Sequence, residues 1–152
     1  MQTIDLSENI NTVLVLYYNQ IKQGIELNLN LEDNIFITCF PDELNQVWTN
    51  IIHNAIHAMD NNGTLTISTE KEEDKVIIKI NDTGSGIPSE IKDQIFEPFF
   101  TTKAIGEGSG LGLDIVCQIL KHHKGSILVD SEPQNTTFTI ELPLKIRTNK
   151  LI

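Results

Sequence analysis

The chain has 152 residues, of which 39% are hydrophobic and 21% are charged, a composition typical of one soluble globular domain. Its 21 acidic residues outnumber its 11 basic residues, which gives a formal net charge of −10 at pH 7. Because proteins bind nucleic acid through basic side chains that neutralise its phosphates, this balance argues against a DNA or RNA partner.

The first third of the chain predicts one helix and two strands. Apolar residues recur at helical spacing over 7–22, where Ser7 is the expected N-cap and Gly24 ends the pattern. Strict alternation of apolar and polar residues over 25–31 predicts a half-buried strand, and residues 35–38 form a second, shorter β run.

A longer amphipathic helix is expected next, from Pro41-Asp42 to about Met59, with Asp42 as its N-cap. Its polar side carries Asn50 and Asn54, which lie four residues apart and therefore share one face. The residues expected to form its apolar face are Leu44, Val47, Trp48, Ile51, Ile52, Ala55, Ile56 and Met59.

The remaining elements predict an α+β fold with two layers. Strands are expected at 64–69, 75–81, 126–130 and 136–142, and helices at 88–95 and 110–123, with an irregular loop at 97–109. Because helices and strands are grouped rather than strictly alternating, we expect an α/β sandwich: one mixed, mostly antiparallel sheet with helices on one face.

Two glycine-rich segments are the strongest functional signal. Residues 82–86 read Asp-Thr-Gly-Ser-Gly, and residues 106–113 read Gly-Glu-Gly-Ser-Gly-Leu-Gly-Leu and lead directly into an apolar helical pattern. Glycine allows the backbone to approach a ligand closely, and free N–H groups at the start of a helix suit a phosphate. The alternative is that these glycines only form tight turns.

The polar residues of the long helix suggest a metal site of the hard-oxygen type. An asparagine amide oxygen is a suitable ligand for Mg²⁺, although every amphipathic helix also has an ordinary polar side. His53 and His57 have the spacing of a zinc-binding pair, but Asn54 stands where a metalloprotease has glutamate, so we expect no zinc. His122 and His123 end a predicted helix and are expected to be capping or surface residues.

Four segments resemble, in order, the ATP-binding motifs of sensor histidine kinases. They are Asn-Ile-Ile-His-Asn-Ala (50–55), Asn-Asp-Thr-Gly-Ser-Gly-Ile-Pro (81–88), Phe-Glu-Pro-Phe-Phe-Thr-Thr-Lys (96–103) and Gly-Glu-Gly-Ser-Gly-Leu-Gly-Leu (106–113). The resemblance covers nearly the whole chain and implies one catalytic and ATP-binding domain over 1–152, with a core of about 5–144. It also implies the Bergerat fold, which this family shares with gyrase, Hsp90 and MutL.

The resemblance implies ATP and Mg²⁺ as cofactors and assigns roles to individual residues. Asn54 resembles the Mg²⁺ ligand, and Asn50 and Lys103 would act with it at the phosphates, although Lys103 could equally be a solvated loop residue. Asp82 resembles the residue that accepts a hydrogen bond from the adenine amino group. The other implied cofactor-binding residues are His57, Gly84, Gly86, Ile87, Gly108, Ser109, Gly110, Leu111, Gly112 and Thr137.

The resemblance also implies partners. Such kinases transfer the γ-phosphate of ATP to a histidine on a separate helical dimerisation domain, from which a response regulator receives it. No motif for that helical domain is recognisable in this chain, so we expect a monomer that does not phosphorylate itself. Phe96 is expected in the core, and Phe99 or Phe100 is expected to be partly exposed for docking to the helical domain.

Three alternatives share the ATP-binding signal. A clamp or chaperone ATPase and an anti-sigma-type serine kinase place a glutamate, which acts as general base, one turn before the metal-binding asparagine. Here that position is Asn50, whose amide cannot take a proton, so the histidine kinase is favoured. A nucleotide-sensing module without transfer chemistry is the third alternative.

The expected location is cytoplasmic. Cys39 and Cys117 stand far apart in apolar surroundings, which indicates buried free thiols in a reducing compartment. The first residues have neither the basic nor the apolar stretch of a secretion signal, and no apolar run approaches the ~18 residues of a membrane span. We expect no direct membrane contact by this domain, and any membrane anchor would belong to another part of the parent protein.

Overall fold

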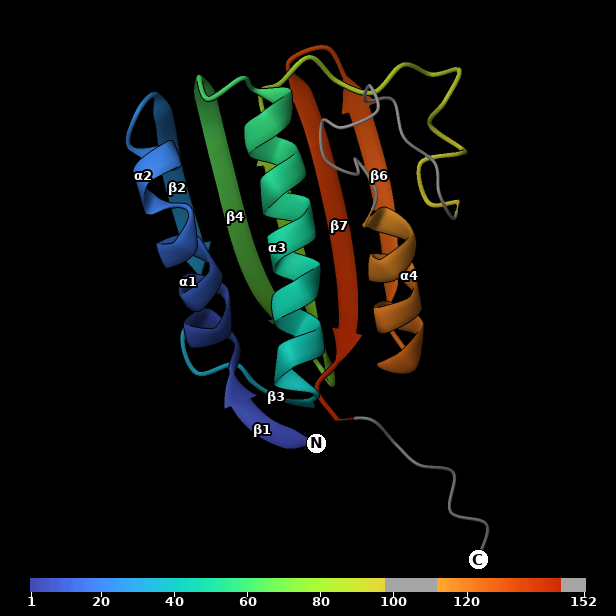
Figure 1. Cartoon of the computed structure of the whole chain (residues 1–152). Coiled ribbons are helices and arrows are strands. Elements are labelled where there is room, and N and C mark those ends of the chain that lie inside the picture. Colours follow the sequence, from blue (N-terminus) through green and yellow to red (C-terminus); the bar gives the residue numbers. More distant parts are fainter. Residues whose placement is uncertain (98–111, 146–152) are drawn as a thin grey trace, which may run out of the picture.

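The computed structural model describes residues 1–97 and 112–145, which form a two-layer α/β sandwich. In this part of the chain, four helices cover one face of a five-stranded sheet (Figure 1): α1 (Leu6–Leu16), α2 (Tyr18–Ile21), α3 (Pro41–Ala58) and α4 (Leu113–His122). The strands lie in the order β2 (Ile25–Leu31), β4 (Gly63–Glu72), β5 (Lys75–Asp82), β7 (Asn135–Pro143) and β6 (Ser126–Glu132). The β2–β4 pair is parallel and the other pairs are antiparallel, so the predicted mixed sheet is confirmed.

A separate two-stranded sheet lies at one end of the molecule. The short run expected at 35–38 forms β3 (Phe36–Cys39), which pairs antiparallel with β1 (Gln2–Asp5). The sequence did not predict β1, because a strand of four residues containing one apolar side chain, Ile4, has no recognisable alternation.

The predicted helix starts require two corrections. Asp5, not Ser7, is the N-cap of α1, where its carboxylate accepts a hydrogen bond of 3.2 Å from Glu8 N. Asp42 lies in the first turn of α3 rather than at its N-cap, which is Phe40. Pro41 occupies the first helical position, where a missing N–H costs nothing.

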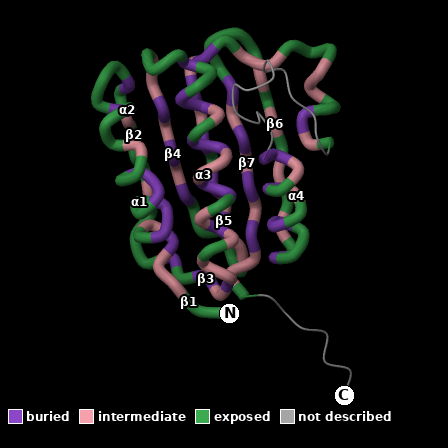
Figure 2. The backbone as a smooth tube through the Cα atoms, in the orientation of Figure 1, coloured by how far each residue is buried: buried purple, intermediate pink, exposed green. Residues whose placement is uncertain are grey.

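The hydrophobic core lies between the helices and the sheet, along the buried segments of Figure 2. All eight residues expected on the apolar face of the long helix are buried. The Trp48 side chain is fully enclosed, and its indole Nε1 donates a hydrogen bond of 2.6 Å to Asn9 Oδ1 on α1. This bond satisfies a polar group that would otherwise be stranded in the core.

The helix expected at 88–95 is absent. Ile91 N donates to Pro88 O at 3.1 Å and Gln94 N donates to Ile91 O at 2.8 Å, so the segment forms successive turns. A helix of two turns gains too few hydrogen bonds to offset its nucleation cost unless packing supports it. Within the described residues, no helix combines the length and the apolarity that crossing a membrane would require.

Candidate functional site

A cavity of about 870 Å³ opens where α3 ends and α4 begins, beside the strands β5, β6 and β7. Its size is that of sites which bind small organic ligands and cofactors. It is lined by Asn54, Ala55, His57, Ala58, Asp82, Ser85, Gly86, Ile87, Pro88, Ser89, Ile91, Ile95, Leu113, Ser131, Glu132, Pro133, Thr136 and Phe138. Most of its wall is apolar, and among the described residues Asp82 carries the only buried carboxyl group.

The Asp82 carboxyl is 3% exposed and accepts a hydrogen bond of 2.9 Å from Gly84 N through Oδ1. Burial raises the pKa of Asp82 to about 6, and the Gly84 hydrogen bond opposes that rise. At pH 7 the carboxylate is therefore mainly ionised, although its surroundings disfavour the charge. A ligand that offers an N–H group to Asp82 would relieve this penalty.

The last strand places Thr136, rather than the expected Thr137, in the cavity. Thr136 is the register partner of Asp82 and is buried. Thr137 pairs with Asn81 on the opposite face, where its Oγ1 accepts a hydrogen bond of 2.7 Å from Asn81 Nδ2. The prediction was out of phase by one residue, which reverses the face of a strand. Phe138, two residues after Thr136, also lines the cavity and therefore marks the face of β7 that borders it.

Ser131 on β6 is a cavity residue that sequence reasoning missed. Its Oγ accepts a hydrogen bond of 2.7 Å from Ile87 N and lies 2.7 Å from Thr136 Oγ1. Two hydroxyls that share one hydrogen bond use one of their two protons, whichever of them donates. The Ser131–Thr136 pair therefore keeps one O–H donor for the cavity, next to the acceptor Asp82. No motif marked Ser131, since its partner Ile87 lies 44 residues away.

Asn50 and Asn54, the two asparagines of α3 that were expected at the site, differ in surroundings. Asn54 lines the cavity together with His57, and its side chain has no hydrogen-bond partner among the described residues. Asn50 does not line the cavity: its Oδ1 accepts from Gln46 Nε2 at 3.0 Å and its Nδ2 donates to Gly112 O at 3.1 Å. The Asn54 oxygen is thus available as a hard donor for Mg²⁺, whereas the Asn50 amide is already engaged.

Packing against neighbouring backbone explains the glycines of the first turn. A Cβ on Gly84 would lie 2.7 Å from the carbonyl carbon of Ala58, and Gly84 is not part of the cavity wall. Gly86 lines the cavity with φ at +87°, and a Cβ there would lie 2.8 Å from Glu132 O. Ile87 follows and is a half-buried residue of the cavity wall.

Several expected site residues lie outside the described residues, and nothing is concluded about them. They are Lys103, Gly108, Ser109, Gly110, Leu111, Phe99 and Phe100. Gly112 is described and is the N-cap of α4, which begins at Leu113. Phe96 packs against the core, edge-on to Phe138 with ring centroids 6.5 Å apart.

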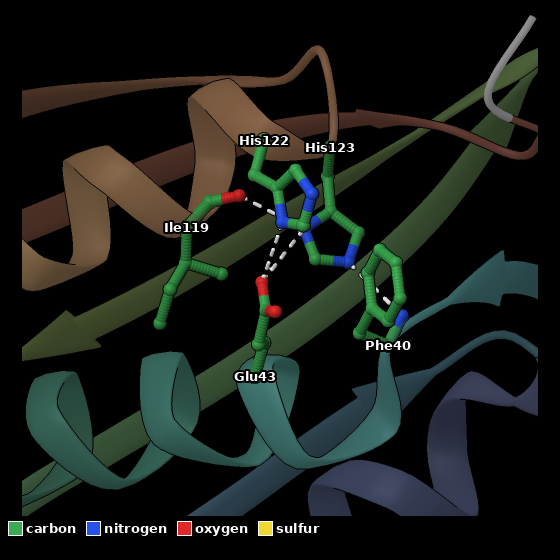
Figure 3. A network of polar contacts seen from close by, with 5 residues as sticks. All are labelled: Phe40, Glu43, Ile119, His122 and His123. Atoms are coloured by element: carbon green, nitrogen blue, oxygen red, sulfur yellow. Dashed lines mark hydrogen bonds and ion pairs between the residues drawn. The ribbon is translucent and has the colours of Figure 1, made fainter. Parts of the chain in front are cut away.

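The helix-terminal histidines connect α3 to α4, as Figure 3 shows. His123, expected to be a capping or surface residue, is the C-cap of α4 but is only 1% exposed: its Nε2 accepts from Phe40 N at 3.1 Å, so Nδ1 carries the proton and donates to Ile119 O at 2.8 Å. His122 is exposed, stacks on Phe40 and lies 2.9 Å from Glu43. Potential ligand atoms of Glu43, His122 and His123 lie within 4.8 Å of one another, but both His123 nitrogens are already used. This group is therefore a structural contact rather than a metal site.

Comparison with known proteins identifies the family. Residues 40–146 match the family described as histidine kinase-, DNA gyrase B-, and HSP90-like ATPase, and the chain belongs to it. Sensor histidine kinase ZraS of Salmonella typhimurium is 40% identical over 152 residues, covering 97% of this chain and 32% of that protein. The catalytic domain of histidine kinase ThkA superposes with a TM-score of 0.87 at 32% identity, over 95% of each chain.

Histidine kinase ThkA in complex with response regulator protein TrrA is a further similar structure, with a TM-score of 0.81 and 30% identity over 94% of this chain and 41% of that one. The fold and the matched segment are those of the catalytic, ATP-binding domain of sensor histidine kinases. The chain spans about a sixth to a third of the length of the curated relatives that it matches.

Proposed function

We propose that this chain binds Mg-ATP in the cavity beside Asp82 and transfers the γ-phosphate to a histidine on a separate helical domain. The observation that carries the proposal is the buried, ionised Asp82 carboxylate in a cavity of cofactor size. The same cavity wall holds the Asn54 amide, which has no hydrogen-bond partner among the described residues.

The base-binding end fits adenine. Ionised Asp82 is an acceptor, and the Ser131–Thr136 pair contributes one hydroxyl donor beside it. Adenine offers the complementary pair, an amino donor next to a ring-nitrogen acceptor, whereas guanine carries a carbonyl oxygen in place of that amino group. The apolar side chains of Ile87 and Phe138 are suited to pack against the faces of the purine.

The phosphate end fits a magnesium complex. The Asn54 oxygen is the hard ligand that Mg²⁺ prefers, and His57 lies one turn further along α3 in the same wall. Bound Mg²⁺ supplies neutralisation of the phosphate charge, which an acidic domain with a net charge of −10 needs. Lys103, at the end of the segment 96–103, and Gly108 and Gly110, in the second glycine-rich segment, remain proposed phosphate contacts.

The surroundings of Asn50 favour a histidine acceptor over the alternative reactions. Its amide cannot act as a base, and it is occupied by Gln46 and Gly112, so the position one turn before Asn54 cannot activate water or a serine hydroxyl. An acceptor imidazole is nucleophilic without help from this chain.

A response regulator is the proposed downstream partner, in agreement with the complex of the similar kinase ThkA with TrrA. The free thiols of Cys39 and Cys117 agree with a cytoplasmic location for the domain.

Calorimetric titration with a non-hydrolysable ATP analogue, with and without Mg²⁺, tests the proposal. We expect micromolar binding that Mg²⁺ strengthens, about a tenfold or greater loss in Asp82→Asn, and wild-type affinity in Asp33→Asn, which removes an equal charge from an exposed loop. In Asn54→Ala we expect Mg²⁺-free binding to persist without the Mg²⁺ enhancement. Absence of binding at millimolar analogue, or equal losses in both aspartate variants, would contradict the proposal.

A further inference from the structure

A row of amides runs along α3 at one-turn intervals and ends at the nucleotide cavity. Gln46 Nε2 donates to Asn50 Oδ1 at 3.0 Å, and Asn50 Nδ2 donates to Gly112 O at 3.1 Å. Asn54, one turn beyond Asn50, lines the cavity. Gly112 O also accepts from Val116 N at 2.8 Å, which is the first hydrogen bond of α4. The row therefore connects the middle of α3 to the start of α4.

Gly112 O fixes the orientation of the Asn50 side-chain amide. A backbone carbonyl accepts and never donates, so Gly112 O requires the NH₂ group of Asn50. The Asn50 oxygen must then face Gln46, which has to supply an N–H. Gln46, although exposed, supports this orientation, because its N–H occupies the Asn50 oxygen and leaves the Asn50 NH₂ group directed toward α4.

Close packing makes the start of α4 sensitive to the orientation of the Asn50 amide. Gly112 has φ at +126°, and a Cβ there would lie 2.6 Å from Asn50 Nδ2, so the backbone sits directly on the Asn50 amide. Leu113, the next residue, is part of the cavity wall. The opposite end of α4 is held independently, by the contact of His122 with Glu43. Asn50 thus secures the end of α4 that borders the nucleotide site.

We propose that Gln46 is a positioning residue for nucleotide binding: it orients Asn50, which in turn fixes Gly112 and the cavity-lining start of α4. This role rests on the proposed function, since the cavity matters only if it binds the nucleotide. Gln46 touches neither the nucleotide nor the metal in this proposal.

The chain of contacts from Gln46 through Asn50 to Gly112, here called the relay, is tested without nucleotide. The test is amide hydrogen exchange, measured by NMR on wild type, Gln46→Ala and Gln46→Glu. Glutamate keeps the length of the side chain but offers no N–H when ionised, so it favours an Asn50 amide whose oxygen faces Gly112 O. We expect exchange at the Val116 amide to quicken in both variants, at least as much in Gln46→Glu, while exchange at the His123 amide stays unchanged. Gln20→Ala removes another exposed glutamine and should leave Val116 unchanged. Unaltered Val116 exchange in both Gln46 variants would overturn the relay.

The consequence for binding is tested by titrating the same proteins with the ATP analogue and Mg²⁺. Loss of one net hydrogen bond in the relay predicts that Gln46→Ala binds the analogue about 3- to 10-fold more weakly than wild type. Gln20→Ala should bind it with unchanged affinity. Altered Val116 exchange with wild-type affinity would overturn the positioning role alone. A wild type that does not bind the analogue would overturn the proposed function and this role with it, and the exchange data would still report whether the relay exists.

Discussion

Replacing Asp82 by asparagine is expected to stabilise the nucleotide-free domain at pH 7 while removing most of its affinity for ATP. The asparagine oxygen can still accept the hydrogen bond from Gly84 N, so the turn keeps its contact. What disappears is a buried negative charge. The two effects have opposite signs, which separates a functional role for Asp82 from a role in stability.

The magnitude follows from the pKa of Asp82, which burial raises from 3.8 to about 6. A carboxyl whose folded-state pKa is raised binds its proton more tightly in the folded protein, so ionisation costs stability as pH rises through this range. The cost is about 3 kcal/mol at pH 7, falls to about 1 kcal/mol at pH 4.5, and vanishes below the unfolded-state pKa. Asp82→Asn does not carry this cost.

Urea unfolding of both proteins at pH 7 and pH 4.5 measures the effect. We expect the variant to be more stable than wild type by about 1–3 kcal/mol at pH 7, with a smaller difference at pH 4.5. Adding the ATP analogue with Mg²⁺ should raise the unfolding free energy of wild type and leave that of the variant nearly unchanged. A variant that is less stable than wild type at pH 7, or a difference that is independent of pH, would refute the reasoning about the buried charge.

Three further predictions test individual contacts. Asn9→Ala leaves the buried indole N–H without its acceptor and should lower the unfolding free energy by about 1–3 kcal/mol in urea titrations. His123→Leu should cost about 1–3 kcal/mol in the same assay, because it leaves the Phe40 backbone N–H without an acceptor and removes one of the two hydrogen bonds that Ile119 O accepts. His122→Ala should cost less than about 1 kcal/mol, and equal effects would contradict the network. Thr136→Val should weaken binding of the ATP analogue about 3- to 10-fold and Thr137→Val should not, and the reverse result would restore the original assignment of the last strand.

Periodicity and motifs predicted much of the fold and part of the site. Helical spacing was sufficient to predict α3, because the row of apolar residues along its buried face is long and unbroken. All of the residues expected on that face are buried. The motifs identified Asp82 and Asn54, which the structure brings into one cavity. The N-cap of α1 was misassigned because Asp5 and Ser7 are both good caps, and the choice depends on Leu6, which is fully buried at the first position of the helix.

The remaining site residues could not be predicted because their roles depend on partners distant in sequence. Ser131 acquires its place from Ile87 N, and Asn50 is engaged by Gly112 O, 62 residues away. The error at Thr137 is of another kind, since the sequence already contained the answer. The apolar residues Phe138, Ile140 and Leu142 alternate along β7 and place Thr136, not Thr137, on the buried face.

The most direct test of the account is the structure of this domain crystallised with Mg²⁺ and a non-hydrolysable ATP analogue. The account predicts the adenine amino nitrogen at about 3 Å from an Asp82 carboxylate oxygen, a hydroxyl of the Ser131–Thr136 pair at the adjacent ring nitrogen, and Mg²⁺ on the Asn54 oxygen. A nucleotide bound outside this cavity, or with its base directed away from Asp82, would contradict it.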